Sequence, residues 1–587
     1  MPAQRAQPLD LDVLEKLLFA RDEEAPGVRS WLAESHRDPL AFWKSLKDAQ
    51  DHLSPLPAKS TPFGEYDFYH DLVVRNLSVE APAFCWYDSE LRGGAVTYGE
   101  LADAANRRAS TWQRGGATAG DVICVVRPVG VDFVVSIVAA LKLGLVLSVL
   151  PPSGRRFVAT RLAALDPAWV DTEEIHRPLI PWPDRVLSGV ARGGQPEADR
   201  SASYSSGSVA ALLFDPASPE GHLPRPLTAD ALFLGPLRDG LVALGLRRGQ
   251  AAAAPGIPYL QAQPALLLAC LLSGGTYVHL ESGDVQRDPS LLVARPLRAV
   301  GIDETTRDAL LRHPQPLGER IGHWFRDPAT SQQTELWQRF VGDLGLQRSW
   351  SANLKWEAAH GGCTLFSLRR QGQAHFEVLP AAGTTWRLAN PAHPERESVT
   401  GHGLLAISPL GAEKPVPVAT ASIVARHGAG WVFAGSQENT RRGVYYPARE
   451  VLEAIEGMPG CLGASVCFAP LFGRDIASVA VLMVFVSRTD AVDDTQLRQL
   501  LERRIRQEMG AEHLPDRIQF FATTPRQDEA GVIDHAWCRS QYLTGSLASK
   551  SKDELFGCIS LLRERIGQES TPAEPDGHGS ARGAGKA

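Results

Sequence analysis

Three side chains suited to acid–base or nucleophilic chemistry lie close together in the stretch WEAAHGGC: Glu357, His360 and Cys363. A histidine three residues from a cysteine can lower the thiol pKa or accept its proton, and the thiolate is the attacking form. The Gly-Gly pair before Cys363 can bring backbone N–H groups close to a reacting carbonyl. Plainer interpretations remain open: a carboxylate that hydrogen-bonds within the fold, a core histidine, and a small buried thiol. We expect Cys270 and Cys467 in the core.

A second candidate is LLFDPASPEGHLPRPLT, which spans residues 212–228. An apolar strand, a loop with Ser, Gly and a basic residue, and a helix-like run make the frame of a phosphate-binding loop. Such a loop needs backbone N–H groups that point at the anion. Pro216, Pro219 and Pro224 have no N–H to give. The stretch therefore predicts the frame of a phosphate loop with impaired donors, followed by Arg225 as the remaining basic residue.

These residues lie within alternating strands and helices. Thr97 and Glu100 have capping-box spacing and predict a helix start. The apolar run 131–150 contains Asp132 and Lys142, so we expect a buried helix followed by a strand rather than a membrane span. The same order of elements returns over residues 228–281. This α/β alternation predicts two related subdomains with mostly parallel sheets.

The remaining regions suggest the domain boundaries. Residues 286–350 show no clear pattern, short β-like segments follow from Thr364, and a region from Gly435 mixes helices and strands. We predict an α/β protein with a large N-terminal domain of two α/β subdomains plus a small β region, and a smaller α+β C-terminal lid. The expected ranges are a helical extension over 1–65, the large domain over 66–434, the lid over 435–547, and a tail over 548–587 with a disordered end.

The composition favours an ordinary globular enzyme. The chain has 587 residues, 44% of them hydrophobic, and a net charge of −7, which argues against nucleic acid as the main partner. None of the eight cysteines forms a Cys-x-x-Cys pair, so no structural zinc or other metal site is expected. The N-terminus lacks an apolar signal core. We expect a soluble cytoplasmic protein without a membrane partner.

The order of these parts resembles the adenylate-forming superfamily of acyl-CoA synthetases, adenylation domains and luciferases. The likeness covers roughly residues 66–547, and the benzoate and anthranilate CoA ligase branch looks closest. Members of the superfamily use ATP to make an acyl adenylate, and the lid then moves so that the acyl group passes to a thiol. The resemblance implies separate residues for the two half-reactions.

Four positions that the resemblance assigns to nucleotide chemistry are altered. The loop ending at Arg225 has lost its hydroxyl-and-glycine character, although this arginine could still bind a phosphate, for example of CoA. Ser422 replaces the aspartate that grips the ribose, and Ser436 replaces the arginine of the hinge motif. Val532 replaces the lid lysine that drives adenylation. Loss of one such electrostatic group typically lowers the rate by about two to three orders of magnitude.

The positions that the resemblance assigns to the thiol half-reaction are better preserved. Gly443, Tyr445 and Pro447 match the lid loop that lines the pantetheine tunnel, and Glu357 with His360 matches the gate of the acyl pocket. The sequence thus predicts an acyltransferase that moves an acyl group from CoA to the phosphopantetheine thiol of an acyl carrier protein in secondary metabolism. The acyl group is expected to be aromatic, such as benzoyl or anthraniloyl.

This reaction requires no cofactor beyond the CoA thioester, because exchange between thioesters is nearly isoenergetic. It can proceed directly or through an acyl-enzyme on Cys363. One alternative is a slow ATP- and Mg-dependent aryl-CoA ligase with substitute residues. The other is a non-catalytic protein that binds a carrier protein.

Overall fold

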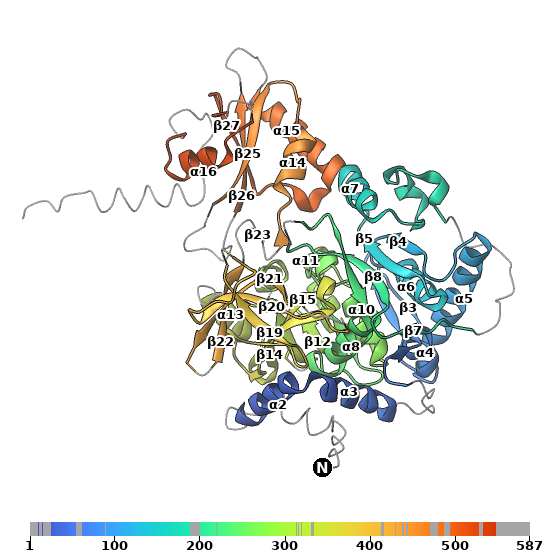
Figure 1. Cartoon of the computed structure of the whole chain (residues 1–587). Helices are drawn as coiled ribbons and strands as arrows, with labels where there is room; N and C mark the ends of the chain where they lie inside the picture. Colours follow the sequence, from blue (N-terminus) through green and yellow to red (C-terminus); the bar gives the residue numbers. More distant parts are fainter. Residues whose placement is uncertain are drawn as a thin grey trace, which may run out of the picture. The chain divides into compact units, whose positions relative to one another are not determined.

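The computed structural model places the chain in two compact units. One comprises residues Met1–Glu450 and Ile505–His513, and the other Val451–Arg504 and Leu514–Ala587 (Figure 1). The structure describes residues 10, 15, 25–53, 62–88, 90–187, 200–218, 220–312, 314, 316–318, 320–329, 334–391, 393–411, 416–428, 430–436, 440–441, 444–469, 479–486, 493–527 and 532–547. The expected tail over 548–587 lies outside these residues. The expected domain boundaries stay predictions.

The first sheet of the large unit confirms the predicted α/β alternation. The capping box at Thr97 and Glu100 forms and starts α5. The run 131–150 folds into α6 and β5, as expected. The strand order is β6-β4-β5-β8-β9, parallel except for β9. The elements of this part are α4 Phe68–Leu72, α5 Tyr98–Arg114, β4 Val122–Val126, α6 Val131–Leu143, β5 Val146–Leu150, α7 Arg155–Leu165, β6 Trp169–Thr172, β8 Val209–Phe214 and β9 Pro224–Thr228.

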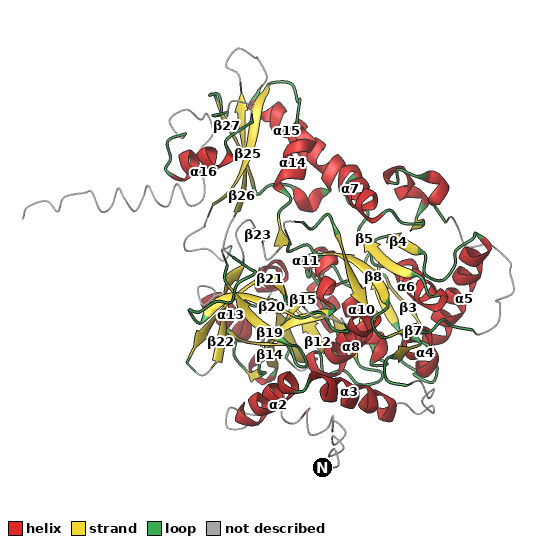
Figure 2. Ribbon diagram, viewed as in Figure 1, coloured by secondary structure: helices red, strands yellow, loops and turns green. Residues whose placement is uncertain are grey.

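A second, eight-stranded sheet has the order β17-β14-β13-β12-β10-β11-β2-β3, parallel except for its two edge strands. Figure 2 shows helices beside the strands of the large unit. The elements are β2 Phe84–Tyr87, β3 Gly93–Val96, α8 Ala229–Arg238, β10 Ala251–Ala253, α9 Tyr259–Ala262, α10 Ala265–Leu272, β11 Thr276–Val278, α11 Ser282–Arg287, β12 Leu297–Gly301, α12 Glu304–Arg312, β13 Ile321–Arg326, α13 Thr334–Asp343, β14 Trp350–Asn353 and β17 Arg370–Gln371.

The stretch 286–350, which showed no clear sequence pattern, supplies two of these parallel strands, β12 and β13, and ends where β14 begins. Its arginines obscured the core pattern. Arg307 and Arg326 are buried, and their guanidinium groups lie 4.8 and 4.5 Å from the ring centroid of Trp337. Long charged side chains can cover apolar surface in this way. An arginine in the sequence therefore does not by itself indicate a loop.

The small β region is an antiparallel seven-stranded sheet with the order β15-β16-β18-β22-β21-β20-β19. It begins with the β15–β16 hairpin, in which Glu357 ends β15 and Cys363 is the second residue of β16, both beside the turn. The short η9 turn, Ala358–His360, joins the two strands. The strands are β15 Lys355–Glu357, β16 Gly362–Phe366, β18 Glu377–Pro380, β19 Trp386–Ala389, β20 His402–Ile407, β21 Val418–His427 and β22 Gly430–Ser436. Two-stranded sheets pair β1 Glu65–Tyr66 with β7 Tyr204–Ser205, and β23 Thr440–Arg441 with β24 Val444–Tyr445.

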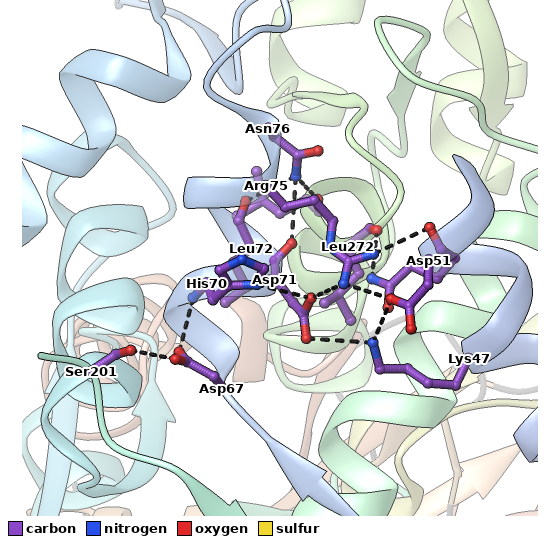
Figure 3. A network of polar contacts seen from close by, with 12 residues as sticks. Lys47, Asp51, Asp67, His70, Asp71, Leu72, Arg75, Asn76, Ser201 and Leu272 are labelled. Carbon is purple, nitrogen blue, oxygen red and sulfur yellow. Dashed lines mark hydrogen bonds and ion pairs between the residues drawn. The ribbon is translucent and has the colours of Figure 1, made fainter. Parts of the chain in front are cut away.

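The N-terminal helices α2, Ala25–Arg37, and α3, Pro39–Leu53, pack on the large unit. A buried polar network ties α3 to the segment after α4 (Figure 3). Lys47 lies 3.7 Å from Asp71, and Arg75 bridges Asp71 at 2.5 Å and Asp51 at 2.7 Å. Because these charges are buried and mutually paired, loss of one partner would leave another uncompensated. The helices are therefore part of the core structure of this unit.

The smaller unit contains a three-stranded sheet of β25 Cys461–Ala469, β26 Val479–Val486 and β27 Arg517–Phe521. Helix α16, His535–Leu543, contributes Cys538 and Tyr542 to its core beside Cys467. Helices α14, Ala448–Ile455, and α15, Asp494–Met509, lie mostly within this unit. This confirms the predicted fold class of a large α/β part and a smaller α+β part. Among the helices described, none combines the length and apolarity needed to cross a membrane.

Candidate active site

The tertiary fold brings the loop after β8 against His360. Nε2 of His360 lies 3.3 Å from Oδ2 of Asp215 and 3.1 Å from a terminal guanidinium nitrogen of Arg225. Arg225 and Asp215 themselves form an ion pair at 3.4 Å. Both Asp215 and His360 expose only 5% of their side chains. His360 is therefore held by an Asp–Arg pair rather than by apolar packing alone.

The charge state of this cluster follows from its partners. Burial acts to raise the pKa of Asp215, but the hydrogen bond with His360 and the charges of His360 and Arg225 outweigh it and lower the pKa to about 2. Asp215 is thus an ionised carboxylate at neutral pH. Nε2 faces an acceptor, Asp215, and a donor, Arg225, at the same time. In the tautomer that keeps the hydrogen bond to Asp215, the proton is on Nε2 and Nδ1 is an acceptor, and within the described residues no hydrogen bond reaches Nδ1.

The loop that resembles a phosphate-binding loop uses backbone N–H groups in hydrogen bonds within the loop. The N–H of Ala217 donates to Oδ1 of Asp215 at 2.9 Å, and the N–H of Ser218 donates to the Asp215 carbonyl at 3.2 Å. The N–H groups of Glu220 and Gly221 both donate to Ser218. A Cβ at Gly221 would lie 2.6 Å from the Asp215 carbonyl oxygen, so the turn closes too tightly for another residue. The N–H groups of Ala217, Ser218, Glu220 and Gly221 are thus already used within the loop.

Glu357 ends β15 and is 3% exposed. The Thr364 hydroxyl lies nearby without hydrogen-bonding geometry, and neither Glu357 oxygen has another partner in the part of the chain that the structure describes. Burial raises the pKa of Glu357, and the charges of His360 and Lys355 offset this only in part. A buried carboxyl without a hydrogen bond is costly for folding. A ligand or substrate that contacts Glu357 would supply the missing hydrogen-bond partner.

Cys363 is buried at the start of β16 with 2% exposure. Its N–H donates to Oδ2 of Asp239 at 2.6 Å, and its carbonyl accepts from Arg238 at 2.7 Å. Burial and then the charge of Asp239 raise the pKa of the Cys363 thiol well above its usual range. An activated cysteine needs the opposite environment, with a lowered pKa. The surroundings of Cys363 thus favour the direct route over an acyl-enzyme.

His360, Gly361 and Cys363 line one cavity of about 170 Å³. Arg238 and Trp43 form part of its wall. The cavity connects the imidazole with the N-terminal helix α3.

Two of the altered nucleotide positions face each other across a strand pair. Ser422 on β21 is the register partner of Ser436 on β22. Ser422 is fully buried at 0% exposure, and its hydroxyl has no partner among the described residues. Ser436 is half-buried, and Val532, in the smaller unit, is 58% exposed. A ribose cannot reach a side chain with no exposed surface, and four N–H groups of the loop are used in internal hydrogen bonds, so the residues present do not fit a nucleoside triphosphate.

The tunnel residues are only partly described. Gly443 lies outside the described residues, and only the backbone of Tyr445, in β24, is placed. Pro447 is buried just before α14. The tunnel assignment therefore stays a prediction.

Sequence reasoning missed the groups that fix these side chains. Asp215 was in the loop considered above but had no role assigned, although an Asp directly after an apolar strand is a recognisable signal. Arg238 and Asp239 lie in a helix-like apolar run, and Lys355 is the first residue of β15. Lys355 is 3% exposed and donates to Asp327 at 2.9 Å. Periodicity cannot distinguish such buried charges from surface ones.

Comparison with solved structures identifies the fold as that of the adenylate-forming enzymes. No family model and no curated protein matches the sequence. A fatty acyl-adenylate ligase from L. pneumophila, bound to acyl adenylate and pyrophosphate, superimposes with a TM-score of 0.59 at 13% identity, over 81% of this chain and 96% of the ligase. The amide bond synthetase of Marinactinospora thermotolerans gives 0.61 at 15% identity, over 81% of this chain and all of that one. The o-succinylbenzoate CoA synthetase of Bacillus subtilis, bound to a product analogue, gives a TM-score of 0.63 at 13% identity. The match covers 84% of this chain and 100% of the synthetase.

Proposed function

We propose that this protein transfers an acyl group from a CoA thioester to the phosphopantetheine thiol of a carrier protein without ATP. In this reaction Nδ1 of His360 removes the proton of the incoming thiol, and the thiolate attacks the acyl carbonyl. The tetrahedral intermediate collapses by breaking its bond to the CoA sulfur. The departing CoA thiolate takes the proton back from His360, so that charge and atoms balance.

A single observation carries this proposal. Asp215 stands in the frame of a phosphate loop but accepts the loop's own N–H group and holds His360. A negative charge at this place opposes the binding of a triphosphate, whereas it stabilises an imidazolium formed by proton abstraction. The carboxylate of Asp215 thus disfavours ATP binding in the loop and supports His360 as a general base.

A second candidate is the ATP-dependent acyl- or aryl-CoA ligase. The fold neighbours favour it over the transferase, because they are ligases and synthetases by name. Glu357 is the residue of this site that agrees with it best, since a buried carboxyl without a hydrogen bond suits a bound cation. The occupied loop donors and buried Ser422 speak against it, and we derive no step through ATP or Mg²⁺.

The proposed partners rest on the sequence resemblance. Gly443, Tyr445 and Pro447 are proposed to line the path of the pantetheine arm. We propose that the acceptor is a carrier protein and that the acyl group is aromatic. Among the fold neighbours, one is an artificial fusion of an adenylation domain with a carrier domain.

The decisive experiment mixes the purified protein with a panel of acyl-CoAs and pantetheine, with and without ATP, and detects acyl-pantetheine by mass spectrometry. We expect transfer above the uncatalysed background without ATP, and its loss in His360→Ala. Activity that requires a free acid plus ATP, with pyrophosphate exchange, would establish the ligase instead. No turnover of any acyl-CoA in either condition would leave the non-catalytic alternative and overturn the proposal.

A further inference from the structure

We infer that the cavity between α3, α8 and the Gly361–Cys363 turn is the acyl site, and that it holds one six-membered ring. This inference rests on the proposed function and names its substrate class. The cavity lies outside the loop and strands that resemble nucleotide-handling positions. Its walls come partly from the N-terminal helix α3, for which no functional role was predicted.

The size of the cavity sets the first limit. Its volume is about 170 Å³. An apolar protein cavity of roughly 150 Å³ is known to accommodate one benzene ring. The walls therefore surround room for one ring, and because the cavity opens to solvent on one side, a fused two-ring system or an eight-carbon chain would extend out of it.

The walls suit an aromatic ring. Trp43 is 3% exposed and contributes its indole, while Ile407 and Leu410 contribute aliphatic side chains. The indole N–H of Trp43 donates to the Gly383 carbonyl at 3.0 Å, which fixes the orientation of this ring. Phe42 supports it from the side with a T-shaped contact at 5.0 Å between centroids. A fixed aromatic wall favours aromatic ligands through ring–ring contacts.

Two adjacent charged residues hold the opposite walls together. Arg238 ends α8, and a π-helical turn, Asp239–Ala243, follows it. Arg238 donates to the carbonyls of Cys363 and Ala382, and Asp239 accepts the Cys363 N–H. A Cβ at Gly235 would lie 1.8 Å from the Gly361 carbonyl oxygen, so glycine permits this close approach. The cavity is thus preorganised rather than a packing gap.

The cavity also contains the reacting end. His360 lines it together with Cys363. A ring held between Trp43 and Leu410 leaves its thioester carbonyl at the His360 side. The half-buried Ser408 and the exposed Thr385 lie at its rim and mark the side open to solvent.

The first test measures binding without turnover. Neutral amides imitate the acyl thioester, so benzamide, 2-naphthamide and octanamide are titrated into the full-length protein by calorimetry. We expect benzamide to bind at least tenfold more tightly than either larger amide. Equal affinities for the three probes, or no binding of benzamide, would overturn the size limit.

The second test places the probe. Ser408→Trp introduces an indole at the rim and should weaken benzamide binding at least tenfold. Val399→Trp is the matched control, because Val399 is 96% exposed and does not line the cavity. Should Ser408→Trp fold poorly, Leu410→Ala enlarges the cavity and should improve 2-naphthamide binding relative to benzamide. Unchanged binding in folded Ser408→Trp, or an unchanged ratio in Leu410→Ala, would contradict the assignment.

The two proposals fail in different ways. Benzamide binding that Ser408→Trp blocks, without any acyl transfer to pantetheine, would retain the cavity assignment and reject the transferase. Transfer that proceeds equally well in Ser408→Trp would retain the transferase and reject the cavity as the acyl site.

Discussion

Oδ2 of Asp215 lies 3.3 Å from Nε2 of His360, although the two residues are 145 positions apart in the sequence. The pair joins the loop after β8 to the turn between β15 and β16. Through this contact, a loop whose N–H groups are largely bonded within the loop holds the imidazole of His360 in place. The contact links the altered nucleotide site to the proposed thiol chemistry.

Asp215→Asn should lower the rate of acyl transfer by about 10²–10⁴, the usual contribution of general acid–base catalysis. The amide cannot stabilise an imidazolium and can impose the wrong tautomer on His360. Transfer to pantetheine at saturating acyl-CoA measures the effect. Asp166→Asn is a suitable control, because Asp166 is 75% exposed and pairs with Arg185. A rate within threefold of the natural protein would show that Asp215 does not act through His360.

The same carboxylate makes a pH-dependent contribution to stability. Its pKa of about 2 lies below the unfolded value of 3.8, so its stabilisation is present above about pH 4 and is lost as the pH falls toward 2. The free energy of unfolding of Asp215→Asn should be lower by about 2 kcal/mol at pH 7. This difference should shrink below about pH 4 in urea titrations.

Cys363→Ala should leave acyl transfer within about threefold of the natural rate, because the high thiol pKa disfavours a thiolate nucleophile. No acyl-enzyme should appear in the intact mass after incubation with acyl-CoA. Cys270→Ala, a core substitution in α10, controls for the loss of a buried sulfur. Abolished transfer together with an acyl adduct on the natural protein would establish the covalent route.

Ser422→Asp should destabilise the large unit by about 2–4 kcal/mol rather than create a ribose site, because it buries a carboxylate without a partner. Ser436→Asp, at the half-buried partner position, should be tolerated better. Thermal unfolding with and without ATP measures both effects. Stabilisation of Ser422→Asp by ATP would support the ligase alternative.

Asp239 should make the folded state less stable as the pH rises. Burial raises its pKa to about 6, despite Arg238, so the folded state keeps a proton that the unfolded state loses. Its unfavourable contribution should grow between about pH 4 and 6 and stay constant above, reaching about 3 kcal/mol. The stability difference between Asp239→Asn and the natural protein should change over this window in denaturant titrations. A difference that is the same at pH 4.5 and pH 7 would contradict the raised pKa.

Local patterns in the sequence determined the class of the fold. The capping box at Thr97, the helix and strand of 131–150, and the repeated α/β order follow from periodicity, which encodes the buried face of each element. That the prolines of the loop impair phosphate binding stays a prediction, although Ala217, Ser218, Glu220 and Gly221 use their N–H groups within the loop. Periodicity failed over 286–350, where buried arginines stack on Trp337 and give core positions a polar character.

The tertiary structure alone decided how the candidate residues are used. The spacing of His360 and Cys363 suggested a nucleophile and its base, but distant Asp239 raises the thiol pKa, and distant Asp215 holds the imidazole. Likewise Trp43 lines the cavity from a helix that the sequence set apart as an extension. The pKa of a side chain depends on the charges that lie beside it in the folded protein, and the wall of a cavity depends on the rings that pack there. These partners are distant in the sequence, so local sequence patterns do not identify them.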